Sequence, residues 1–139
     1  MQRAYFDDFE PGQDWGAHSW TTSEAICRRW QSAGLGGCPE ETDPANSDRR
    51  LRAPPALVLV ALSQAMQDRL RDKPPGGVHA KQSLAFHAPV FADDVLTTSV
   101  AVKAKYVKRE RRYVEFETKT VNQAGELVLS ALRTVIWAG

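Results

Sequence analysis

A run of seven consecutive apolar residues, Ala56–Leu62, constrains the fold of this 139-residue chain more than any other feature. A helix built from them would be hydrophobic on every side, and such helices lie inside a protein core. The alternative, a buried β-strand, covers only Leu57–Val60 well, because good helix formers follow. The run therefore predicts a buried central helix, in which we expect Leu59 and Leu62 to be almost fully buried.

The ends of this helix are also marked in the sequence. Pro54 and Pro55 suit a first helical turn, where missing N–H groups cost little. Basic side chains near the other end, including Arg71, oppose the negative end of the helix dipole, and a Pro-Pro-Gly-Gly run at 74–77 stops the helix. We therefore expect the helix to span about Pro55–Arg71.

Bulk properties limit the protein class. The length suits one domain, 1–139, with a real core. Because 18 basic residues face 17 acidic ones, for a net charge of +1, no global field favours nucleic acid. No apolar run reaches the roughly 20 residues that a membrane helix needs, and no signal-peptide pattern opens the chain. Cys27 and Cys38 lack the spacing of a zinc site. We expect a cytoplasmic protein without metal or cofactor that binds neither nucleic acid nor membranes.

Three segments precede the central helix. The first, residues 5–13, is predicted to be an ordered lead-in anchored by Tyr5, Phe6 and Phe9. An edge strand is expected over Asp14–Trp20, and the N-cap signals that follow predict a short helix over about Ser23–Ala33. The residues expected on the inner side of this helix are Ala25, Ile26 and Trp30.

The segment Gly34–Arg52 contains glycines, prolines and several carboxylates but almost no large apolar residue. It is predicted to be a long loop. Loops longer than about 12 residues inside compact domains are uncommon, and they are usually functional or disordered. Both interpretations stay open for this segment.

After the central helix the apolar pattern changes to a period of two, which is typical of β-strands. The first strand starts near Lys81, with alternate residues on opposite faces: Ser83, Ala85 and His87 on one, and Gln82, Leu84 and Phe86 on the other. Three further strands are predicted: Leu96–Tyr106, Val114–Lys119 and Glu126–Trp137. The turns between them are Lys108–Arg112 and Asn122–Gly125.

The predicted strands form an antiparallel meander with one apolar face. In the longest strand that face consists of Leu96, Thr98, Val100, Val102, Ala104 and Tyr106. A sheet with one apolar face needs a cover, and the central helix is the only element hydrophobic enough to provide it. The sequence therefore predicts an α+β fold in which an antiparallel sheet wraps around a long central helix.

Several segments resemble landmarks of the MaoC-like hydratase/dehydratase family, which has a single hotdog fold. These segments are Tyr5–Gln13, Thr22–Glu24, Phe86–Val90 with Asp93–Asp94, and Asn122–Glu126. The resemblance implies a homodimer, or a heterodimer with another hotdog subunit. It also implies that an acyl thioester on CoA or on a carrier protein enters beside the central helix.

Hydratases of that family use an aspartate and a histidine from a loop of the pattern Gly-Asp-x-Asn-Pro-x-His, and water adds next to the thioester carbonyl. Alignment of this loop, with one inserted residue, puts Leu35 at the aspartate and Glu41 at the histidine. Leucine cannot transfer a proton, and the loop contains no histidine. The resemblance therefore implies a non-standard active site.

Glu41 and Asp43 could form an acid/base pair in which burial raises one pKa. A solvated acidic loop explains them equally well. His87 is the third catalytic candidate because it lies at a strand end near the expected thioester groove, although a hydrogen-bonded structural histidine is its simpler interpretation. None of the three histidines has a nucleophile or metal partner at a useful spacing.

The start of the central helix, at Ala53, Ala56 and Leu57, is the candidate substrate-binding site. Free amides and the positive end of the helix dipole could hold a thioester oxygen there, or the segment merely begins a helix. A basic hairpin over 103–112 could bind CoA phosphates or an acidic carrier protein, or it is simply solvated. It contains Lys103, Lys105, Lys108, Arg109, Arg111 and Arg112.

Three functions follow from these observations. The first is an acyl-thioester hydratase or dehydratase with a non-standard acid/base set. The second is a non-catalytic, substrate-binding subunit that shapes the acyl groove for a catalytic partner. The third is a thioesterase in which Glu41 activates water, because hotdog folds also host that hydrolysis. Fold analogy alone does not separate them.

Overall fold

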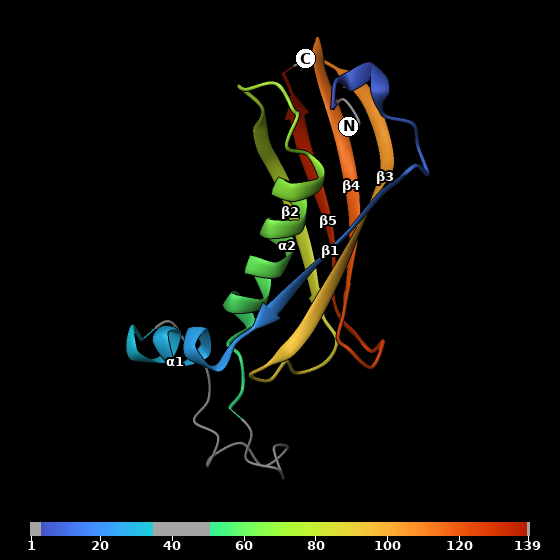
Figure 1. Cartoon of the computed structure of the whole chain (residues 1–139). Coiled ribbons are helices and arrows are strands. Elements are labelled where there is room, and N and C mark those ends of the chain that lie inside the picture. The colour runs from blue at the N-terminus through green and yellow to red at the C-terminus, as the bar shows by residue number, and fades with distance from the viewer. Residues whose placement is uncertain (1–3, 35–50, 139) are drawn as a thin grey trace.

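The computed structural model describes residues 4–34 and 51–138 (Figure 1). The elements in chain order are the 3-10 helix η1 (Phe6–Asp8), β1 (Asp14–Thr22), α1 (Glu24–Ser32), α2 (Pro55–Arg69), β2 (Val78–Phe86), β3 (Asp94–Lys108), β4 (Arg111–Val121) and β5 (Leu127–Trp137). The strands form one sheet in the order β1-β3-β4-β5-β2. All neighbouring strands are antiparallel.

The sheet curls around α2, which crosses its inner face as Figure 1 shows. The helix packs mainly against β1 and β3 and less against β4, whereas nearly all residues of β2 are exposed. Its buried residues are Leu57, Val58, Ala61, Leu62, Ala65 and Met66. This arrangement confirms the predicted α+β hotdog fold.

The central helix lies where it was predicted, but it is not buried on every side. It ends at Arg69, two residues before the predicted Arg71. Leu62 is fully buried, as predicted, but the prediction for Leu59 was wrong because this residue is only partly buried. The sheet covers one side of α2, whereas Leu59 and Val60 lie on a side that a single chain leaves partly open. An apolar helix surface is therefore available for another molecule.

The β3–β4 hairpin contains an irregularity that its sequence pattern hides. Leu96, Thr98, Val100 and Val102 are buried, as predicted. A β-bulge between Val102 and Ala104 then shifts the pairing, and the extra residue changes which face the later side chains occupy. The predictions that Ala104 and Tyr106 continue the buried face were therefore wrong.

Beyond the bulge, Lys105 takes the inner position. Its Nζ lies 5.2 Å from the centre of the Phe6 ring, a cation–π contact, and donates a hydrogen bond to the Phe6 carbonyl at 3.4 Å. Arg112 approaches the same ring, at 5.6 Å. Two cations of the predicted basic hairpin thus hold the N-terminal segment against the sheet.

The N-terminal lead-in is ordered, as predicted, and Phe9 is its main anchor. The ring of Phe9 is fully buried, and its centroid lies 4.8 Å from Trp15, 5.4 Å from Phe116 and 4.9 Å from Trp137. The Trp137 indole N–H donates to the Ala4 carbonyl at 2.7 Å. The prediction that Tyr5 also anchors the segment was wrong, because Tyr5 is 49% exposed.

The edge strand β1 and the helix α1 follow in the predicted order. The Ser23 hydroxyl caps α1 by accepting a hydrogen bond from the Ile26 amide at 3.3 Å. The side chain that α1 buries is Cys27, whereas Ala25 is exposed, contrary to its prediction. Cys27 is a free thiol, and burial raises its pKa.

The strand β2 lies at the open edge of the sheet and begins at Val78, three residues before the predicted start. It pairs only with β5, and a bulge lies between His79 and Lys81. Leu84 and Phe86 are 37% and 47% exposed. An edge strand with exposed apolar side chains is a surface on which another chain can pair.

Candidate functional site

A groove of about 270 Å³ lies at the N-terminal end of α2. One wall comes from the start of the helix, and the other comes from the segment that follows β2. The lining residues are Arg52, Ala53, Pro55, Val58, Phe86, His87, Ala88, Pro89 and Val90. Two of the predicted site residues, Ala53 and His87, therefore face the same groove.

Backbone pairing holds the two walls together. The Ala53 amide donates to the Val90 carbonyl at 2.8 Å, and the Ala92 amide donates to the Leu51 carbonyl at 2.7 Å. Just beyond, the buried Asp94 carboxylate accepts hydrogen bonds from the Phe91 amide, at 2.9 Å, and from the Gln123 side chain, at 3.0 Å. Backbone hydrogen bonds thus fix the position of the two groove walls, and the hydrogen bonds of Asp94 stabilise the segment beside them.

Of the three predicted residues at the helix start, the structure distinguishes Ala56 as the available donor. The amide of Ala53 is used by Val90, and that of Leu57 donates to the Pro54 carbonyl at 2.9 Å. In the described ranges, 4–34 and 51–138, the Ala56 amide has no hydrogen-bond partner, and Ala56 is exposed. Ala56 and the fully buried Leu57 do not line the groove themselves.

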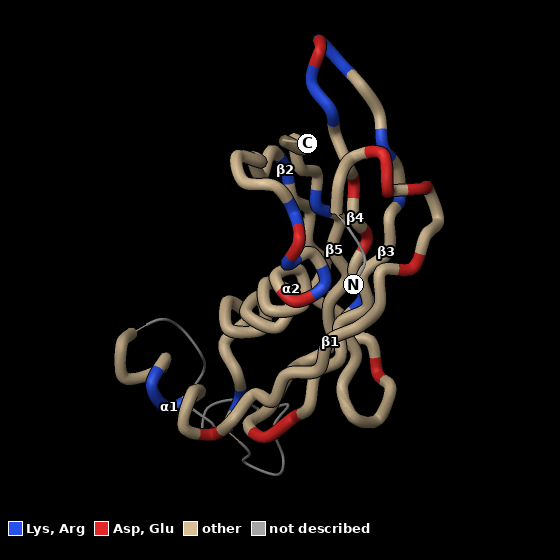
Figure 2. Tube along the Cα trace, turned by 45° about the horizontal axis from the view of Figure 1, so that its top comes forward, with Lys and Arg blue, Asp and Glu red and all other residues tan. Residues whose placement is uncertain are grey.

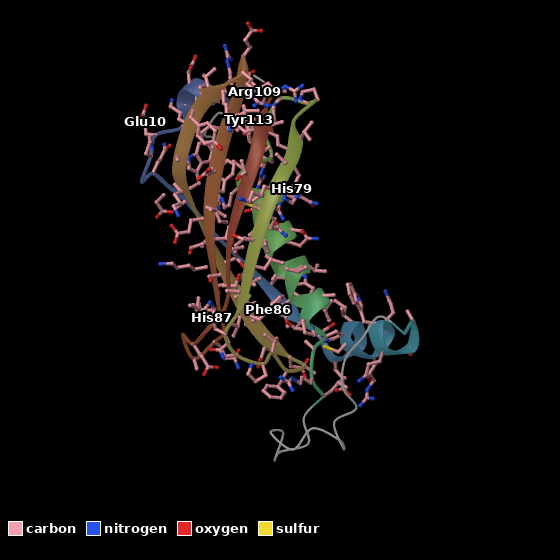
Figure 3. The ribbon with its side chains drawn as sticks, turned by 180° about the vertical axis from the view of Figure 1, so that it is seen from behind. Glu10, His79, Phe86, His87, Arg109 and Tyr113 are labelled. Atoms are coloured by element: carbon pink, nitrogen blue, oxygen red, sulfur yellow. The ribbon has the colours of Figure 1, made fainter. Side chains whose placement is uncertain are left out.

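His87 lies at the end of β2, next to Phe86 (Figure 3). Its Nε2 shares a hydrogen bond of 2.8 Å with the Ser130 hydroxyl, and its amide donates to the Val128 carbonyl at 2.9 Å. The imidazole is exposed to solvent. These contacts orient the ring, and its other nitrogen has no hydrogen bond within the described part of the chain.

The two other predicted catalytic residues, Glu41 and Asp43, lie outside the described residues, as does Leu35. The described chain resumes at Leu51, where an isolated β-bridge joins Arg52 to Phe91 beside the groove. Glu41 and Asp43 as catalytic residues therefore stay predictions.

The basic hairpin forms the projecting end of β3 and β4. Figure 2 shows Lys and Arg positions gathered along it. At its tip Arg109 and Glu110 have positive φ angles of 50° and 64°, as in a tight two-residue hairpin turn. On its outer face Tyr106 and Tyr113 stack, with ring centroids 5.1 Å apart.

Sequence reasoning did not single out Arg133 as a site residue. It lies in a second cavity, of about 330 Å³, beside the C-terminal half of α2. The sequence signal that could have indicated it is that Arg133 is the one charged residue in the strand Leu127–Trp137.

Among the described residues, no group of three or more His, Cys, Asp and Glu side chains could hold a metal ion. No described helix has the length and apolar character needed to cross a bilayer.

A family model described as "FAS1-like, dehydratase domain region" matches residues 12–131, which is most of the chain. The chain belongs to this FAS1-like dehydratase family. The match runs from β1 into the first half of β5 and includes both walls of the groove. A comparison with curated protein sequences returned no match.

Solved structures resemble this chain in fold. R-hydratase PhaJ1 from Pseudomonas aeruginosa has a TM-score of 0.78 and 23% identity, over 99% of this chain and 87% of that one. A MaoC-like dehydratase from Rhodospirillum rubrum has a TM-score of 0.78 and 17% identity, over 98% of both chains. The HadBC complex, a 3R-hydroxyacyl-ACP dehydratase from Mycobacterium tuberculosis, gives 0.73 and 20%, over 98% and 99%. These structures confirm the predicted hotdog fold, and the family model confirms the predicted dehydratase family.

Proposed function

We propose that this chain binds an acyl thioester, carried by CoA or a carrier protein, in the groove at the start of α2. The observation that carries the proposal is the Ala56 amide at the positive end of the central helix, which has no hydrogen-bond partner among the described residues and lies beside a groove that contains His87. The R-hydratase and the 3R-hydroxyacyl-ACP dehydratase of the same fold support the substrate class. The reaction would be hydration of an enoyl thioester, or its reverse.

Hydration needs a hydrogen-bond donor for the thioester oxygen, a base and an acid. The Ala56 N–H and the helix dipole would stabilise the negative charge that develops on the thioester oxygen. A base would take a proton from water as its oxygen adds to the β-carbon, and an acid would return a proton to the α-carbon. Glu41, Asp43 and His87 are the groups we propose for these proton transfers.

The second candidate function is a non-catalytic subunit that completes the site of a hotdog partner. Two observations favour it. Leu35 and Glu41 stand where the resemblance places the usual aspartate and histidine, and HadBC is a complex of two different chains. In this case the groove would bind the acyl group, whereas the partner would supply the proton-transfer groups.

The first test compares binding with turnover. We expect the purified chain to bind crotonyl-CoA measurably in calorimetry but to hydrate it poorly or not at all, because both usual proton-transfer groups are absent. Loss of the enoyl thioester absorbance measures hydration. R-hydratase PhaJ1 serves as the positive control. If neither CoA thioesters nor carrier-protein thioesters bind, the proposed function is wrong.

The second test concerns self-association through β2. We expect the chain to sediment at twice its 15.4 kDa mass, because the open edge of β2 and the exposed Leu84 and Phe86 can pair with a second copy. Leu84→Glu should give a monomer, since a charge would then replace an apolar side chain at the pairing edge. Val107→Glu, an exposed position on the β3–β4 hairpin, is the matched control. A clean monomer of the unmodified chain would favour a heteromeric partner.

A further inference from the structure

The cavity at the C-terminal half of α2 has a largely apolar wall. Met66 and Leu70 come from the helix end, whereas Val135 and Trp137 come from β5. The segment 73–77 closes one side, and adding a Cβ at Gly77 would bring it within 3.2 Å of the Ile136 carbonyl oxygen. A cavity of about 330 Å³ with such walls suits an aliphatic ligand.

The titratable side chains in this wall are all basic: Lys73, His79 and Arg133. Arg133 is partly buried, and its Nε donates to the Gln82 side-chain oxygen at 2.8 Å. In the part of the chain that the structure describes, no carboxylate lies within ion-pair distance of Arg133. Burial lowers the pKa of this guanidinium. A partly buried cation without an anion is unfavourable, so a negatively charged ligand group would be favoured in this cavity.

Strand geometry fixes Arg133 toward α2. Side chains two residues apart lie on the same face of a strand, so Arg133 shares its face with Val135 and Trp137, which line the same cavity. Burial lowers the pKa of His79, and the charge of Arg133 lowers it further. A bound anion would compensate the charge of Arg133, and the neighbouring His79 therefore offers a spectroscopic signal for binding.

We propose that this cavity binds the terminal carboxylate of an acyl chain through Arg133, so that the preferred thioester carries a dicarboxylic acid rather than a simple fatty acid. The inference rests on the proposed function, because the thioester end must lie in the groove beside Val58. Met66, in the cavity, is eight residues further along α2, or about 12 Å at 1.5 Å per residue. An acyl group of medium length is needed to join the two sites. Figure 3 shows Phe86 and His79 toward opposite ends of β2, which matches this separation.

Two CoA thioesters of equal chain length test the inference: octanoyl-CoA and suberoyl-CoA, which differ by one terminal carboxylate. Calorimetry on the full chain should show that suberoyl-CoA binds at least about tenfold more tightly, as expected for one charge-assisted hydrogen-bonded pair. Arg133→Met should remove this preference, and Arg133→Lys should keep part of it. Lys81→Met is the matched control, because Lys81 lies on the neighbouring strand β2 but lines a different hollow, next to Tyr106.

Equal affinity of the unmodified chain for the two thioesters would overturn the carboxylate inference and leave the proposed function standing. If neither thioester binds, the proposed function fails, and free octanoate then decides whether the cavity takes a carboxylate at all. Shifts of the His79 and Trp137 NMR signals that disappear in Arg133→Met and persist at reduced size in Arg133→Lys would support it. Absence of such shifts would overturn it.

Discussion

Replacing Phe9 by alanine should destabilise the protein by about 3 to 5 kcal/mol, the usual range for removing a buried aromatic side chain. The ring is fully buried and touches Trp15, Phe116 and Trp137, which belong to three different strands. Its loss would leave a cavity where the N-terminal segment meets the sheet. Urea unfolding followed by tryptophan fluorescence measures the change.

Tyr5→Ala is the matched control for this experiment. Tyr5 lies in the same segment, but its side chain is 49% exposed, and surface substitutions usually change stability by no more than about 0.5 kcal/mol. A Phe9→Ala effect as small as that of Tyr5→Ala would contradict the aromatic cluster as the anchor of the N-terminus.

If the chain turns over an enoyl thioester, Glu41→Gln should lower kcat by about a hundredfold to ten-thousandfold, the usual contribution of one positioned acid/base group. KM should stay near its starting value, because proton transfer acts mainly in the transition state. The amide has almost the shape of the carboxylate but cannot take up or release the proton. Steady-state hydration kinetics measure both constants.

Glu40→Gln is the control, since it removes the same charge from the neighbouring position. We expect it to leave kcat near that of the unmodified chain. Asp43→Asn tests the proposed acid/base partner of Glu41 in the same assay. Turnover that survives both Glu41→Gln and Asp43→Asn would transfer the proton-transfer role to His87.

Most of the architecture follows from periodicity. The run Ala56–Leu62 specified a helix, and the alternation after Lys81 specified strands, because each pattern matches one repeat of the backbone. The misses at Ala104 and Leu59 have different causes. The bulge in β3 depends on pairing with β4, and the exposure of Leu59 depends on how far the sheet extends. Both features depend on contacts between residues far apart in the sequence, which a local pattern does not reveal.

The candidate site was predictable only in outline. Ala53 and His87 were expected near one groove because each ends or begins a segment beside the central helix, and the structure brings them together there. Which amide is free was not predictable, because the Ala53 amide is taken by Val90, a residue distant in sequence. Arg133 was missed for the same reason: its cavity is made by a helix, a linker and two strands.

The bulge in β3 makes two positions almost a hundred residues apart dependent on each other. If the same residues alternated strictly, with no bulge between Val102 and Ala104, Lys105 would turn outward, and Phe6 would lose both its cation and the donor to its carbonyl. In the evolution of related chains, straightening of β3 without loss of a residue would therefore relax selection for an aromatic side chain at position 6. The bulge in the hairpin and the residue choice at the N-terminus should be inherited together.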